Sequence, residues 1–100
     1  MSMRVIAKKT LVLYYTAQRD AETALREWYD KVEKADWLSF ADVRKTFNSA
    51  DYVGNNRIVF NIKGNKYRLV ALTLFRNKMV YIRFVGTHSE YQNIKDIENI

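Results

Sequence analysis

The chain has 100 residues, of which 48% are apolar and 28% are charged, a composition typical of one globular domain and not of a disordered segment. Its formal net charge of +6 favours a polyanionic partner such as nucleic acid, although a charge that only keeps the protein soluble is the alternative. The absence of cysteine excludes a disulfide framework and zinc sites with thiolate ligands.

No part of the sequence has the length or composition of a membrane span or a secretory signal. The longest apolar stretch, residues 69–75 with Thr73 inside it, is far too short to cross a membrane. Three basic residues precede the apolar residues 11–15, but this run is too short for a signal peptide and no cleavage site follows it. Proline and low-complexity linkers are missing as well. We therefore expect one cytoplasmic domain over residues 1–100 that does not contact a membrane.

The first half of the chain has mainly helical periodicity. Residues 4–7 are typical of a short strand, and residues 10–17, whose apolar run fits a strand or a helix, are interpreted as a helix. Asp20 is a candidate N-cap for an amphipathic helix. The apolar face of that helix consists of Ala21, Ala24, Leu25, Trp28, Tyr29, Val32 and Ala35. A further short helix is predicted after a near capping box at Ser39 and Asp42, with Phe40, Val43 and Phe47 on its buried edge.

From Tyr52 onward the periodicity changes to two, which is typical of strands. Gly64 and Asn65 are a good signal for a two-residue hairpin loop. This loop places three pairs of residues opposite each other: Val59 and Val70, Phe60 and Leu69, and Asn61 and Arg68. One face of the hairpin is then apolar and the other is basic.

The next chain reversal, at Arg76 and Asn77, has weaker turn chemistry because an Asn-Gly pair would be expected. A two-residue loop at this place predicts three further pairs: Ala71 and Ile82, Val70 and Arg83, and Leu69 and Phe84. Arg83 then lies on the same face as Arg57 and Arg68. A register slip of one residue would turn the Arg83 guanidinium inward, where an unpaired charge is costly, so the outward register is preferred.

The last strand is predicted to end at Val85 and Gly86, and a capping box at Thr87 and Glu90 indicates a short C-terminal helix with Tyr91 and Ile94. His88 lies in the first turn of that helix. The positive end of the helix dipole and the neighbouring bases disfavour a charged imidazole there. We therefore expect a neutral His88 that is able to accept a proton.

Residues 52–88, called the basic stretch below, contain no Asp or Glu. Their seven basic residues are Arg57, Lys63, Lys66, Arg68, Arg76, Lys78 and Arg83. Without acidic partners, these charges repel each other until an anion binds. Arginines hold a phosphate, aromatic rings stack on bases, and a neutral base removes a proton from a 2′-hydroxyl, so the stretch has the parts for metal-independent RNA cleavage. The alternative is a solvated strand face with a structural histidine.

Three segments of this region, VGNNRIVFNI (53–62), GNKYRLV (64–70) and YIRFVGTHSEY (81–91), resemble the signature of the HigB family of bacterial type II toxins. Residues 35–37 and 49–51 fit as well, so the resemblance covers essentially the whole chain. It implies an α+β domain of the RelE-like type, with an antiparallel twisted sheet of about four strands, two or three helices packed on one face, and a short C-terminal helix.

The resemblance also implies an mRNA endonuclease that acts on translated messages at the ribosome, is inhibited by a HigA-like helix-turn-helix antitoxin, and needs no metal or cofactor. Arg68 matches a phosphate-contacting arginine, and His88 and Tyr91 match the basic residue and the tyrosine that follow the last strand. The expected catalytic residues are Arg68, His88, Lys66, Arg83 and Tyr91. The expected RNA-binding residues are Arg57, Asn61, Lys63, Tyr81, Arg76 and Lys78. The general base is left open between His88 and Lys66.

Two other functions remain possible at this point. A ParE-like toxin of the same fold inhibits DNA gyrase and is not a nuclease, although the complete set of basic residues and the histidine argue against it. A non-catalytic RNA-binding protein associated with the ribosome is the other alternative, and its binding would survive the loss of His88.

Overall fold

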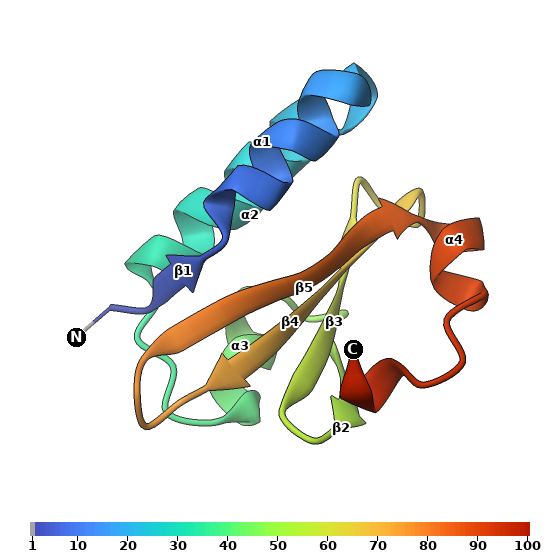
Figure 1. Ribbon diagram of the computed structural model, residues 1–100. Coiled ribbons are helices and arrows are strands. Elements are labelled where there is room, and N and C mark those ends of the chain that lie inside the picture. Colours follow the sequence, from blue (N-terminus) through green and yellow to red (C-terminus); the bar gives the residue numbers. More distant parts are fainter. Residues whose placement is uncertain (1) are drawn as a thin grey trace.

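Five strands form one mixed sheet in the computed structural model, which describes residues 2–100 (Figure 1). The strands are ordered β1-β5-β4-β3-β2 across the sheet. Their bounds are β1 (Arg4–Ile6), β2 (Asp51–Gly54), β3 (Arg57–Ile62), β4 (Tyr67–Leu74) and β5 (Met79–Thr87). Neighbouring strands are antiparallel except β1 and β5, which are parallel. The α+β class is confirmed, but the expected antiparallel sheet of about four strands is wrong in strand number and in the direction of β1.

Both differences have a physical reason. Strand β2 is short and partly polar, and it reaches β3 through a two-residue turn at Asn55 and Asn56 with φ values of 51° and 66°. Asparagine tolerates this left-handed conformation, so the Asn-Asn pair was a hairpin signal that the sequence analysis missed. Strand β1 is too short to specify its partner by pattern, and the long connection through the helices allows it to run parallel to β5.

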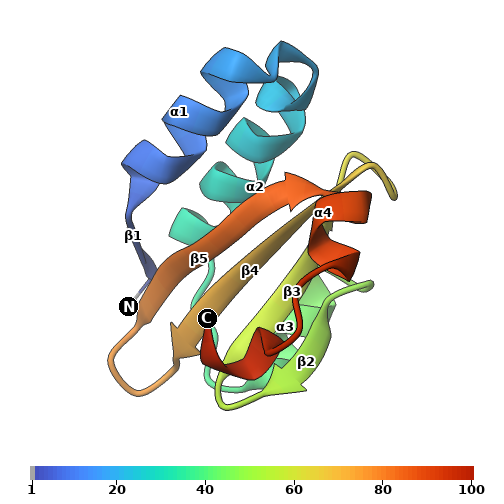
Figure 2. The same ribbon diagram turned by 45° about the vertical axis from the view of Figure 1, so that its right-hand side comes forward.

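The longer helices lie on one side of the sheet and the C-terminal segment lies on the other (Figures 1 and 2). Helices α1 (Lys8–Ala17), α2 (Glu22–Lys34) and α3 (Phe40–Thr46) form the first layer. Helix α4 (His88–Gln92) and a 3-10 helix, η2 (Ile97–Asn99), follow β5 and cross the opposite side. The predicted helix at residues 10–17 is confirmed by α1. None of the helices within residues 2–100 is long and apolar enough to span a membrane.

One of the three predicted helix caps, Asp20, is wrong, and a second, Ser39, has the predicted position but lacks the capping bond. Asp20 lies in a short 3-10 helix, η1 (Arg19–Ala21), and Ala21 is the N-cap of α2 without a side-chain cap. Ser39 is the N-cap of α3, but its hydroxyl makes no capping bond, and Asp42 accepts instead from the Leu38 N–H at 2.8 Å. The Asp20 carboxylate contacts the β3–β4 turn, where two lysines attract it more strongly than the backbone N–H groups of α2 do.

The β3–β4 register is confirmed at all three predicted pairs. On the β4–β5 side, Ala71 lies opposite Ile82 as predicted, but a bulge follows, so that Val70 pairs with Phe84 and Leu69 with Val85. The two predicted pairs beyond Ala71 are therefore wrong. The bulge leaves Arg83 outside the regular pairing and exposed, so its predicted outward orientation is confirmed.

The core lies between the sheet and the layer of α1, α2 and α3, and aromatic rings form its centre. The Phe60 ring on β3 contacts three other rings, with centroid separations of 5.4 Å to Trp28, 6.3 Å to Trp37 and 5.2 Å to Phe47. Phe60 is 1% exposed. Because these rings come from α2 and from the segments directly before and after α3, Phe60 fixes the helical layer on the sheet.

Replacing Phe60 with alanine should lower the free energy of unfolding by about 3–5 kcal/mol, because it removes a buried ring and leaves a cavity. Urea denaturation followed by tryptophan fluorescence measures this loss. Leu38→Ala is the control, since Leu38 is 74% exposed and should change stability by less than about 0.5 kcal/mol. A loss below about 1 kcal/mol for Phe60→Ala would contradict the central place of this ring.

Candidate functional site

The turn between β3 and β4, residues 63–66, lies beside the start of α4. The His88 backbone N–H donates to the Lys66 carbonyl oxygen at 3.1 Å, which extends the β4–β5 pairing up to the turn. The predicted capping box is confirmed: the Thr87 hydroxyl accepts from the Glu90 N–H at 3.1 Å, and a Glu90 carboxylate oxygen accepts from the Thr87 N–H at 2.8 Å. These bonds fix His88 as the first residue of α4, next to Lys66.

Arg68 is buried, with only 8% of its surface exposed. Its Nη1 donates to the carbonyl oxygens of Asn65 and Tyr67, both at 3.1 Å, and its Nη2 donates to Asn65 Oδ1 at 3.0 Å. These bonds use at most three of the five guanidinium N–H groups, and Nε has no acceptor among residues 2–100. No Asp or Glu in that part of the chain pairs with Arg68. The guanidinium therefore keeps an uncompensated charge and free donors.

The two lysines of the turn do have an acidic partner. Asp20, between α1 and α2, binds Lys63 through one carboxylate oxygen and Lys66 through the other, the latter at 2.6 Å. At the far turn, Lys78 binds Asp36 at 2.6 Å. The sequence expectation that the basic stretch has no acidic partners is therefore wrong for these three lysines, because the acids come from segments outside it. Within residues 2–100, its four arginines form no ion pair with Asp or Glu.

Tyr91 on α4 lies within electrostatic range of Arg68. Burial, together with the negative charge of Asp51 on β2, raises the pKa of the Tyr91 hydroxyl, while the Arg68 charge opposes this rise. Tyr91 therefore remains a neutral phenol at physiological pH and is able to donate a hydrogen bond. The His88 imidazole makes no hydrogen bond to the described residues, so both of its ring nitrogens are available.

Arg57 and Arg83 form a second basic group further along the sheet. Arg57 Nη2 and Arg83 Nε both donate to the main-chain oxygen of Ile100, at 2.8 and 3.0 Å. The Asn55 side chain fastens the same segment by donating to the Glu98 carbonyl oxygen at 3.1 Å. Residues 97–100 therefore already bind two guanidinium groups with predicted roles: Arg57 was expected to bind RNA, and Arg83 was expected to take part in catalysis.

The other predicted residues are spread over the sheet. Asn61 lies opposite Arg68, and the Tyr81 hydroxyl contacts the Met79 sulfur at 3.4 Å. Arg76 and Lys78 belong to the β4–β5 turn, at the opposite end of the sheet from residues 63–66. Arg57 is four residues from Asn61 along β3, or about 13 Å at the usual rise of a strand. The predicted residues thus separate into a cluster at the β3–β4 turn, a pair at Ile100, two distant charges in the β4–β5 turn, and Asn61 and Tyr81 on strands β3 and β5.

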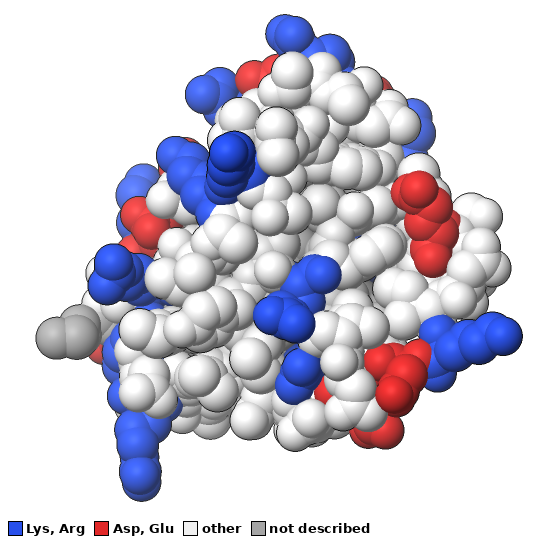
Figure 3. All heavy atoms as spheres, viewed as in Figure 1, with Lys and Arg blue, Asp and Glu red and all other residues white. Residues whose placement is uncertain are grey.

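We call the first group the turn cluster, and it consists of Lys63, Lys66, Arg68, His88 and Tyr91. Figure 3 shows that the molecular face crossed by the C-terminal segment is mainly uncharged, with Lys and Arg atoms near its centre and Asp and Glu atoms toward its right-hand margin. Positive charge on this face is therefore local. Asp20, which binds Lys63 and Lys66, and Asn65, which binds Arg68, were not predicted to belong to the site. The one available signal for Asp20 was the lack of acidic residues in the basic stretch, whose positive charge attracts a carboxylate from elsewhere in the chain.

The fold and the turn cluster define a small basic α+β domain with a group of basic side chains at one end of its sheet. A family model described as "HigB_toxin, RelE-like toxic component of a toxin-antitoxin system" matches residues 21–94. The chain belongs to this HigB toxin family.

Curated relatives share a shorter region with the chain. It is 52% identical over 33 residues to the "mRNA interferase toxin HigB" of Escherichia coli strain K12 and to the "mRNA interferase HigB" of Escherichia coli O157:H7 and of Shigella flexneri. The matched region covers 33% of this chain and 32% of each relative. The chain thus matches about a third of the length of these relatives.

Removing residues 97–100 should free Arg57 and Arg83 and tighten RNA binding by about five-fold, because two more charges become available to phosphates. Fluorescence anisotropy with an RNA that carries 2′-deoxy substitutions measures the affinity at one fixed salt concentration. The same truncation in an Arg57→Gln, Arg83→Gln double variant is the control and should bring no gain. Unchanged or weaker binding in the truncated wild-type background would contradict the competition between Ile100 and RNA.

Proposed function

We propose that the protein is the toxin of a toxin–antitoxin system and acts as an endoribonuclease that cleaves translated mRNA on the ribosome, in the cytoplasm. The family membership and the printed names of the relatives support this proposal. The antitoxin would be a HigA-like helix-turn-helix protein. Cleavage of translated messages would stop protein synthesis and growth.

One observation carries the proposal more than any other, namely the buried Arg68 guanidinium without a carboxylate partner among residues 2–100. A buried charge normally has a partner because its desolvation is expensive. The protein does provide a carboxylate for Lys63 and Lys66 in the neighbouring turn, so the lack of one for Arg68 is selective. A phosphate that binds at the Nε–H and the remaining Nη2–H would supply the missing negative charge.

Around that phosphate, the turn cluster offers the groups that transesterification of RNA requires. A base removes the proton of the 2′-hydroxyl, the 2′-oxygen bonds to phosphorus, and the bond from phosphorus to the 5′-oxygen breaks as that oxygen takes up a proton. Arg68 and Lys66 stabilise the negative charge on the non-bridging oxygens, and Tyr91 donates a hydrogen bond to one of them. The products are a 2′,3′-cyclic phosphate and a free 5′-hydroxyl.

The contacts of the two candidate bases favour His88 over Lys66. The hydrogen bond and the charge of Asp20 raise the pKa of Lys66, so this ammonium group keeps its proton at neutral pH. The His88 imidazole has no such partner, and the His88 main-chain N–H donates to the Lys66 carbonyl oxygen. We therefore assign proton removal to His88 and charge stabilisation to Lys66. Arg57, Arg83, Asn61, Lys63 and Tyr81 would bind the RNA on either side of the cleaved phosphate, with Arg76 and Lys78 further away.

Pulsed expression followed by primer extension on a translated message tests the function. Wild-type protein should produce cuts in phase with codons. Arg68→Lys keeps the charge but loses the planar fork, and it should reduce cleavage by about 100-fold or more. His88→Gln removes the proton acceptor and should cost about 100-fold or more as well. Arg44→Ala, which removes an exposed arginine from α3 on the other side of the sheet, is the matched control and should cleave normally.

Two outcomes would contradict the nuclease. Intact messages in growth-arrested cells, together with inhibited DNA supercoiling by gyrase, would favour the ParE-like alternative. Binding to ribosomes without any cleavage, unchanged in His88→Gln, would favour a non-catalytic RNA-binding protein. Circular dichroism of each variant establishes that a loss of cleavage is not a loss of folding.

A further inference from the structure

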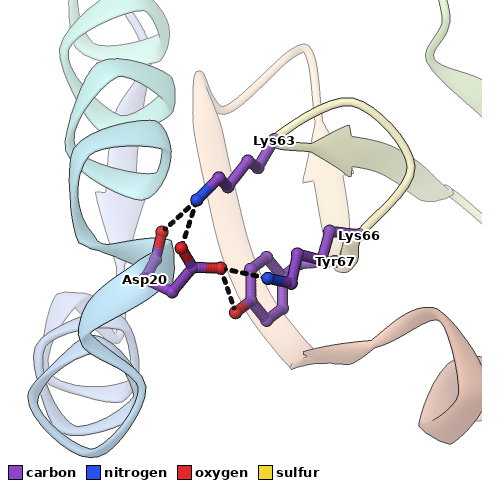
Figure 4. A network of polar contacts seen from close by, with 4 residues as sticks. All are labelled: Asp20, Lys63, Lys66 and Tyr67. Atoms are coloured by element: carbon purple, nitrogen blue, oxygen red, sulfur yellow. Dashed lines mark hydrogen bonds and ion pairs between the residues drawn. The ribbon is translucent and has the colours of Figure 1, made fainter.

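Asp20 joins the helical layer to the turn cluster through four polar contacts (Figure 4). Its Oδ1 binds the Lys63 ammonium group, and its Oδ2 binds Lys66 Nζ at 2.6 Å and accepts from the Tyr67 hydroxyl at 3.0 Å. The main-chain oxygen of Asp20 accepts a further bond from Lys63 Nζ at 3.2 Å. The corner between α1 and α2 is thereby attached to residues more than 40 positions later in the sequence.

The contacts of Asp20 restrict the side chains of two lysines, while Tyr67 holds the Asp20 carboxylate itself in place. Lys63 and Lys66 are partly exposed, with 45% and 58% of their side chains accessible, so their four-carbon chains would otherwise sample many rotamers. Tyr67 is 2% exposed, and its ring packs edge-on against Tyr14 of α1 at a centroid separation of 6.1 Å. The Asp20 carboxylate is thus fixed on one side by a rigid core tyrosine and fixes two mobile ammonium groups on the other.

The position of Lys66 connects this contact to the site. The Lys66 carbonyl oxygen accepts from the His88 N–H at 3.1 Å, and Arg68 binds Asn65 in the same turn. A displacement of the turn would therefore move Lys66, Arg68 and the start of α4 together. Asp20 itself carries a negative charge and cannot bind a phosphate, so any contribution to cleavage has to act through its partners.

We propose that Asp20 is a positioning residue of the cleavage site, which acts through Lys66: by holding the Lys66 side chain it fixes the turn in which the Lys66 carbonyl oxygen accepts from the His88 N–H and Asn65 accepts from Arg68. This inference rests on the proposed function. It explains why an acidic residue lies beside an anion site: one carboxylate shared by two lysines leaves a net charge of +1 and orders both side chains. The same contacts lower the pKa of Asp20, first through Lys63 and then through Lys66, so the carboxylate stays ionised throughout the physiological range.

The alternative is that Asp20 only stabilises the fold. A double-mutant cycle distinguishes the two roles, because residues that act through one another are not additive. The measured quantity is the single-turnover rate of cleavage of ribosome-bound mRNA at saturating enzyme. The variants are Asp20→Asn, Lys66→Gln and the combination of both, and the melting temperature of each is recorded.

Asp20→Asn should reduce the rate by about ten-fold in the wild-type background and by less than about two-fold in the Lys66→Gln background. In a Lys63→Gln background the full ten-fold loss should remain, which separates the two lysines. Asp20→Glu, which keeps the charge, should recover much of the rate. Asp36→Asn is the matched control: it breaks a similar ion pair with Lys78 at the far end of the sheet and should leave the rate unchanged.

Equal losses from Asp20→Asn in the wild-type and Lys66→Gln backgrounds would overturn the inference and leave the proposed function intact. A loss that follows the melting temperature, with no recovery in Asp20→Glu, would overturn it as well. Absence of cleavage by the wild-type protein on any message would instead overturn the proposed function, and the inference with it.

Discussion

The uncompensated charge of Arg68 determines how the rest of the site is arranged. A guanidinium that is 8% exposed needs either a counter-ion or a substrate, and the chain supplies only neutral acceptors from Asn65 and Tyr67. These acceptors belong to the same turn that carries Lys66, so holding Arg68 also shapes the turn. The strand pairing then brings the start of α4, with His88 and Tyr91, to the same place. Burial of one charge thus organises the groups to which we assign RNA binding and cleavage.

Most of the other charges of the basic stretch have partners, and this division gives them different roles. Asp20 satisfies Lys63 and Lys66, while the main-chain oxygen of Ile100 satisfies Arg57 and Arg83. The phosphates of an RNA strand would have to bind Lys63 and Lys66 in the presence of Asp20. They would have to compete with the C-terminal segment for Arg57 and Arg83. Electrostatic attraction of RNA to this protein would therefore be partly opposed by its own structure. Arg68 is buried and keeps free donors, and Arg57 Nε is a further buried donor without a hydrogen-bond partner among residues 2–100.

Short-range patterns in the sequence were sufficient for much of this arrangement. The Gly64-Asn65 loop fixed the β3–β4 register, and the capping box at Thr87 placed His88 at the start of α4, because both depend on residues that are neighbours in the chain. The bulge beside Arg83 was missed, since two alternating strands predict regular pairing and contain no signal for an extra residue.

Contacts between distant segments could not be predicted in the same way. Asp20 looked like a helix cap because local pattern cannot reveal that two lysines 43 and 46 positions later compete for its carboxylate. The contact of Ile100 with Arg57 and Arg83 also joins segments that are distant in the sequence, so it could not be predicted either. Burial of Arg68 was also hidden, since an arginine that alternates with apolar residues on a strand is usually exposed. The sequence thus indicated candidate residues for the site, and the structure was needed to tell which charges have acidic partners.

In the proposed complex, a phosphate of the RNA binds the free side of the Arg68 guanidinium. This contact can be tested by titrating the isotope-labelled protein with an RNA blocked by 2′-deoxy substitutions and recording the side-chain NMR signals of the arginine Nε–H groups. The Arg68 signal should shift in proportion to the RNA bound, and the Arg44 signal, on the other side of the sheet, should not. Saturation of the protein with RNA while the Arg68 signal stays unchanged would contradict it.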